Sequence, residues 1–134
     1  MFQKFVYWTG LSDFLVGIAT WAGALNMVMT APVPGVFSAL IALGMSLCMF
    51  AALLMWASQD IQGRAPIIAW QAVVRLSAAA SVLYALPHGL ASSQYELALV
   101  FWDGPIAIVY IVGVLRVTGR SLADLLLCKP LIPA

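Results

Sequence analysis

Four long runs of apolar residues, separated by short polar or proline-rich segments, constrain this chain more than any other feature. The runs extend from about residue 5 to 31, 36 to 57, 66 to 86 and 95 to 117, and the second contains no charged side chain. A helix needs about 20 apolar residues to cross ~30 Å of hydrocarbon. The runs are continuous rather than alternating, which is typical of membrane helices and not of barrel strands. The sequence therefore predicts an all-α integral membrane protein.

The composition excludes the other broad classes. Hydrophobic residues make up 64% of the 134 residues and charged residues only 8%, whereas an average soluble domain has about 25% charged residues. These few polar groups cannot cover a soluble globular domain or a coiled coil, and disordered chains are poor in apolar residues. A net charge of +1 without a basic stripe excludes nucleic acid as a partner. The expected partners are the lipid bilayer and other membrane proteins or further copies of this chain.

Short connections between the runs predict the topology. Pro32 and Pro34 mark a tight first turn, the polar segment 58–65 forms the second connection, and Pro87 to Gly89 end the third span. Short links make neighbouring helices antiparallel. We therefore expect a single membrane domain over residues 1–134, an up-down four-helix bundle followed by a tail at 118–134.

The distribution of basic residues predicts the orientation. The amino-terminal segment, the second connection and the tail lie on one side and hold every Lys and Arg outside the spans, whereas the other side holds only His88. The positive-inside rule then places both termini in the cytoplasm. The N-terminus does not resemble a transit peptide, which favours the inner (cell) membrane. Aromatic side chains fall near both expected interfaces: Tyr7, Trp8, Trp56, Trp70, Tyr84 and Tyr95.

The tail has two interpretations of equal weight. Ser121 followed three residues later by Asp124 resembles the start of a capped helix, with Asp in place of the usual Glu or Gln. Such a helix would place an apolar face of leucines on the inner membrane surface. Alternatively, the fourth span simply continues into the tail.

Three charged side chains lie inside the spans and away from their ends: Asp13, Arg75 and Asp103. Each costs about 2.5–3.5 kcal/mol to insert, so such residues usually pair and face the interior of a bundle. Helical spacing places each of them on a face with small or polar residues. We therefore expect one intramembrane polar cluster of these three residues.

Depth along the spans suggests which of the three residues pair. With span centres near residues 19, 77 and 106, Asp13 lies about 9 Å and Arg75 about 3 Å on the cytoplasmic side of centre, and Asp103 about 4 Å on the outer side. Side chains lean toward the N-terminus of their helix. Arg75 then leans toward Asp13, whereas Asp103 leans away from it. The expected pair is Asp13–Arg75.

Asp103 precedes Gly104 and Pro105, and a proline there removes a mid-helix hydrogen bond. We therefore expect the fourth helix to be kinked or broken at this point. Asp103 would then either cap the second half-helix or hold a proton in a desolvated site, although a purely structural role is slightly favoured. Possible lining residues of a pocket here are Gln71, Trp102 and Tyr110.

The short four-span design is similar to that of the small multidrug resistance transporters. Asp13 occupies a place comparable to the acidic residue early in the first helix of that family. The family has Glu there, and its surrounding signature is absent from this chain. The resemblance therefore implies architecture alone.

Three functions compete, and the sequence assigns no catalytic residue. The favoured one is a non-enzymatic accessory or assembly subunit of a membrane complex. The alternative is a proton-coupled small-molecule carrier that uses the Asp–Arg–Asp cluster. A further alternative is an isomerase-like enzyme acting on a lipid-soluble substrate. A single His and two distant cysteines, Cys48 and Cys128, predict no metal and no cofactor.

Overall fold

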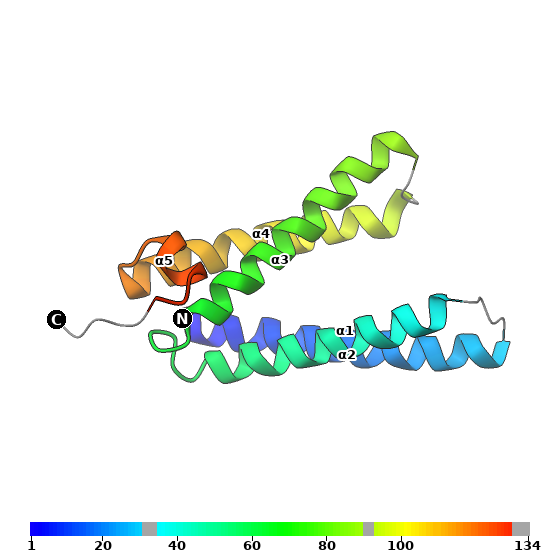
Figure 1. Ribbon diagram of the computed structural model, residues 1–134, viewed down its shortest axis with the longest axis horizontal. Coiled ribbons are helices and arrows are strands. Elements are labelled where there is room, and N and C mark those ends of the chain that lie inside the picture. The colour runs from blue at the N-terminus through cyan, green and yellow to red at the C-terminus, as the bar shows by residue number, and fades with distance from the viewer. Residues whose placement is uncertain (31–34, 90–92, 130–134) are drawn as a thin grey trace. The chain divides into compact units, whose positions relative to one another are not determined.

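The computed structural model describes residues 1–30, 35–89 and 93–129, with the backbone alone for residues 28, 29, 93–96 and 98. The elements are α1 (Phe2–Thr30), α2 (Val36–Ala57), α3 (Ala65–Ala85), the short 3₁₀ helix η1 (Leu86–His88), α4 (Ser93–Thr118) and α5 (Leu122–Leu126) (Figure 1). No strand occurs within these described ranges. The all-helical prediction is confirmed, and the long helices match the four predicted runs to within three residues at each end.

Glycine and proline lie at the beginning or end of several helices. Pro66 lies in the first turn of α3, where its missing N–H costs nothing. Gly89 and Gly119 have φ angles of +66° and +65° and follow η1 and α4, a backbone conformation that favours glycine. The predicted turn at residues 32–34 lies outside the described residues.

Three helices in the described part of the chain are long and apolar enough to cross a membrane. They are Val36–Ala57, Ala65–His88 and Leu99–Thr118. The remaining long helix, α1, has 29 residues, and its crossing of the membrane stays a prediction. The chain is therefore a helical protein suited to the membrane.

The helices divide into two compact units, residues 1–59 and residues 60–134. The first holds the helix pair α1–α2, and the second holds α3, α4 and α5. The four-helix bundle predicted from the sequence stays a prediction.

In the first unit, α1 and α2 lie side by side (Figure 1) and approach closely at two glycines. A Cβ atom on Gly17 would lie 2.7 Å from Cys48 Sγ and 2.9 Å from the Gly44 carbonyl oxygen, and a Cβ atom on Gly44 would lie 2.9 Å from the Gly17 carbonyl oxygen. Such contacts require glycine on both helices. Gly17, which belongs to the face of small and polar residues predicted for the first span, therefore lies directly against α2.

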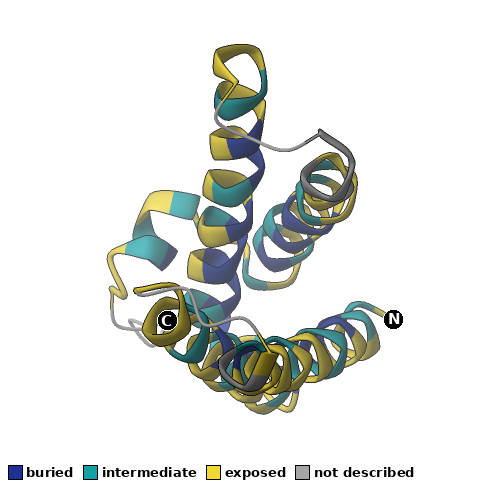
Figure 2. Ribbon diagram, turned by 90° about the vertical axis from the view of Figure 1, so that its right-hand side faces the viewer, coloured by how far each residue is buried: buried dark blue, intermediate teal, exposed yellow. Residues whose placement is uncertain are grey.

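In the second unit, α3 packs against both α4 and α5. The buried residues of α3 form a strip along one side, and the opposite side is exposed (Figure 2). Trp70 Nε1 donates a hydrogen bond to the Leu126 carbonyl oxygen at 3.0 Å, which ties α5 to the start of α3. Leu125 is fully buried. The tail thus forms a separate docked helix and does not continue α4, which decides between the two interpretations of the tail.

The helix α4 runs through Pro105 without interruption from Ser93 to Thr118. The break that the sequence predicts at Gly104–Pro105 is therefore absent, and a kink stays a prediction. A proline inside a helix removes one backbone hydrogen bond but leaves the helical path possible when packing supports it. Packing is available here because Ile106 and Ala107 are buried.

Most aromatic residues expected at the membrane interfaces are exposed. Tyr7, Trp8, Trp56, Trp70 and Tyr84 have exposed side chains, and the side chain of Tyr95 lies outside the described residues. Exposure near helix ends is what the interfacial prediction requires.

Candidate functional site

The candidate site lies between α3 and α4 in the second unit. Gln71 and Arg75 lie one turn apart on the buried face of α3, and both are buried. Asp103 and Tyr110 lie two turns apart on α4, where Asp103 is half-buried and Tyr110 is fully buried. Helical spacing places each pair on one side of its helix. The four side chains therefore share the α3–α4 side of this unit.

Arg75 forms an ion pair with Asp103, in which Arg75 Nη1 donates to Asp103 Oδ1. The arginine side chain is 5% exposed and the aspartate side chain 14% exposed. The Arg75 guanidinium carbon also lies 5.8 Å from the centre of the Tyr110 ring, within the range of a cation–π interaction. The pair therefore gives each charge a counter-charge in an apolar surrounding.

This pairing corrects the prediction that Asp103 leans away from Arg75. Arg75 and Asp103 are equally far from Ala85 and Ser93, the two helix ends that adjoin the α3–α4 connection. Antiparallel helices joined by a short connection have those ends at one level, so equidistant residues face each other. Depths counted from the centre of each span do not include this alignment, so they place the two residues at different levels.

Asp13 and Trp102 are the two remaining residues of the predicted cluster and pocket. Asp13 is half-buried on α1, in the first unit, and its pairing with Arg75 stays a prediction. Trp102 is 56% exposed on α4, so it does not join the buried side chains at Arg75. Gln71 and Tyr110 are the predicted lining residues that are buried, and Tyr110 lies beside the Arg75 guanidinium.

A cavity that the sequence analysis missed lies in the first unit, where α1 begins and α2 ends. It has a volume of about 590 Å³ and is lined by Gln3, Lys4, Tyr7, Trp8, Ser58 and Gln59. The sequence does indicate that these residues lie together, because a hairpin of two long helices brings the first residues of one helix beside the last residues of the other.

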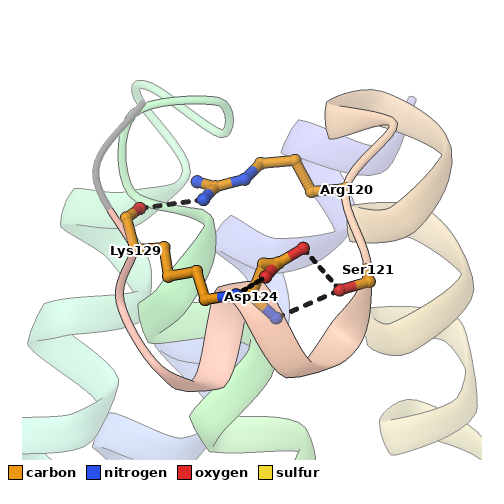
Figure 3. Close-up of polar contacts among 4 residues, drawn as sticks. All are labelled: Arg120, Ser121, Asp124 and Lys129. Carbon is orange, nitrogen blue, oxygen red and sulfur yellow. Dashed lines mark hydrogen bonds and ion pairs between the residues drawn. The ribbon is translucent and has the colours of Figure 1, made fainter. Parts of the chain in front are cut away.

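A second polar cluster surrounds α5, outside the spans (Figure 3). Ser121 caps the helix by accepting a hydrogen bond from the Asp124 backbone N–H at 3.1 Å, and its hydroxyl donates to Asp124 Oδ2 at 2.6 Å. Lys129 Nζ lies 2.5 Å from Asp124 Oδ1, and Arg120 Nη2 donates to the Lys129 carbonyl oxygen at 2.8 Å. The hydrogen bonds from Lys129 and Ser121 lower the pKa of Asp124 below 3.8. The predicted cap is thus confirmed.

The chemistry of the α3–α4 site is that of a matched charge pair. Its two charges are opposite and in contact, and none of its four side chains lines the cavity at the end of α1 and α2. Among the described residues, no group of three His, Cys, Asp or Glu side chains is arranged to hold a metal ion. The arrangement is suited to holding α3 and α4 together at one register.

No family model matches the chain, and neither the curated proteins nor the solved structures contain a significant match to it.

Proposed function

We propose that this protein is a non-enzymatic accessory subunit of a membrane complex. The observation that carries the proposal is the Arg75–Asp103 ion pair, which uses the two intramembrane charges of the second unit on each other. A carrier or enzyme presents its charged groups to a ligand, whereas a buried pair of this kind fixes register and specificity of packing. The polar residues of α3 and α4 then serve structure, and the protein acts through its surfaces.

Large apolar side chains on α4 support this proposal. Phe101 is 76% exposed, and Trp102 and Ile108 are also exposed. Aromatic side chains of this kind are enriched where one protein contacts another. On a helix that is apolar enough to span the membrane, they form a surface that suits a partner helix or lipid.

The test is the composition of the native particle. Native membranes are solubilised in a mild detergent, the particles are separated by native electrophoresis, and comigrating proteins are quantified by mass spectrometry. We expect the chain in a particle that contains other membrane proteins at a fixed ratio to it. Replacing Phe101 and Trp102 by leucine should release the chain from this particle, whereas the same change at exposed Trp21 of α1 serves as the matched control.

A chain that travels alone as a small homo-oligomer would contradict the accessory role. The carrier hypothesis would then take its place, with Asp103 as the titrating residue. Its signature is loss of transport in Asp103→Asn with the fold retained.

A further inference from the structure

We infer that the cavity at the end of α1 and α2 binds the phosphate group of an anionic phospholipid. The inference is independent of the proposed function, because a subunit and a carrier alike have a lipid-facing surface. It rests on the lining of the cavity, on its position along α2 and on the apolar surface beside it.

The lining is built to accept an anion. Lys4 is the only charged side chain among the six lining residues, and no carboxylate is among them. Tyr7, Trp8 and the amides of Gln3 and Gln59 add neutral donors on the same wall. Charge-assisted hydrogen bonds from an ammonium group to phosphate are about twice as strong as neutral ones. A single positive charge among neutral donors matches the single negative charge of a phosphodiester.

Two lining residues show where the cavity lies along the helix pair. Ser58 and Gln59 directly follow Ala57, the last residue of a helix that is long and apolar enough to span the membrane. The Ser58 hydroxyl donates to the Met55 carbonyl oxygen at 2.7 Å, so Ser58 closes the end of α2. The cavity thus lies where a spanning helix ends, at the depth of lipid headgroups.

The surface beside the cavity favours a lipid over a soluble anion. Tyr7 and Trp8 are exposed, and their rings meet edge to face with centres 5.9 Å apart. Amphipathic rings of this type prefer the membrane interface. Farther along α1, Leu15 and Val16 are exposed and apolar, which provides a surface for acyl chains. A volume of about 590 Å³ is within the usual range of ligand pockets.

The experiment counts lipids on the intact chain. The protein in a non-ionic detergent is titrated with phosphatidylglycerol or phosphatidylcholine, and bound lipid is measured by native mass spectrometry. We expect phosphatidylglycerol to bind more tightly than phosphatidylcholine. Lys4→Gln should weaken phosphatidylglycerol binding by roughly tenfold or more, the effect of one charged hydrogen bond. Tyr7→Phe, which keeps the ring, should weaken it less.

Arg116→Gln is the matched control, since it removes one exposed positive charge at the end of α4, outside the cavity. It should leave phosphatidylglycerol binding unchanged. Equal losses in Lys4→Gln and Arg116→Gln would overturn the inference, as would equal affinity for the two lipids. Competition by millimolar inorganic phosphate would overturn the lipid as the ligand. Lys4 is exposed, so the fold of the variant is not at risk, and circular dichroism checks it.

Discussion

At the level of single residues, the Arg75–Asp103 ion pair explains how two charges are tolerated in membrane helices. Helical spacing predicts that Arg75 and Asp103 lie on interior faces, and in the second unit the two side chains form an ion pair between α3 and α4. Spacing along one helix carries no information about the level of a second helix. The partner of Arg75 therefore depended on the α3–α4 connection, whose length aligns the two helices.

Replacing one partner of the ion pair should lower the free energy of unfolding far more than replacing both partners together. Arg75→Met and Asp103→Leu each remove one partner of this buried ion pair, and each should lower the free energy of unfolding by about 3–5 kcal/mol. The double variant should recover most of that loss, because both charges are gone. Unfolding in mixed detergent micelles measures all four proteins of the cycle.

Arg116→Met provides the control for this cycle, because Arg116 is exposed at the end of α4. This substitution should change the free energy of unfolding only a little. A double variant as unstable as the worse single variant would show that the two charges do not stabilise each other.

The Asp124 carboxylate has a pH dependence that its neighbours set. Its folded pKa lies below 3.8 because Lys129 and Ser121 bond to the charged form. The contribution of Asp124 to the free energy of unfolding is therefore complete above the ordinary pKa of an aspartate. It is lost as the pH falls through the lower pKa of the folded state. In Lys129→Gln the midpoint of the Asp124 carboxyl titration, measured by NMR, should rise toward 3.8. An unchanged midpoint would mean that Lys129 does not hold this carboxylate.

At the level of elements, the helix boundaries were largely predictable. Apolar runs indicate the long helices, and proline and glycine mark their ends. The docking of α5 was not predictable from its own pattern, because it depends on a hydrogen bond between Trp70 and Leu126, which lie far apart in the sequence. Likewise, Pro105 indicated a broken helix, but packing of the neighbouring residues keeps α4 continuous.

The contact between α1 and α2 should be sensitive to one methyl group at Gly17. A Cβ atom there meets Cys48 Sγ at 2.7 Å and backbone atoms of Gly44 and Cys48 at 2.9 Å. Backbone cannot yield as a flexible side chain can, so Gly17→Ala should lower stability by about 1–3 kcal/mol. In a Cys128→Ser background, the rate of maleimide labelling at Cys48 should rise as the helices separate.

Gly23→Ala is the control for this variant in the same helix. No atom lies within 4 Å of a Cβ at Gly23, so the variant should match the parent protein or gain a few tenths of a kcal/mol from helix propensity. Equal labelling of Cys48 in the two variants would show that Gly17 does not set the approach of α2.

At the level of the whole molecule, the described chain comprises two helical units suited to the membrane. Composition alone predicted this class, because a chain with 8% charged residues has too few of them to cover the surface of a soluble protein. Composition does not assign a function, since many membrane proteins share it. Two surfaces distinguish this molecule. The composition of the native particle tests the exposed surface of α4, and the lipid titration tests the cavity at the end of α1 and α2.

The ion pair between Arg75 and Asp103 also bears on biosynthesis. The two residues are 28 positions apart in the chain, so the arginine of the third helix emerges from the ribosome ahead of its counter-charge. A lone arginine at mid-helix costs about 2.5–3.5 kcal/mol during translocon-mediated insertion. The third helix should therefore wait at the translocon for the fourth, and the two should enter the bilayer together as a helical hairpin.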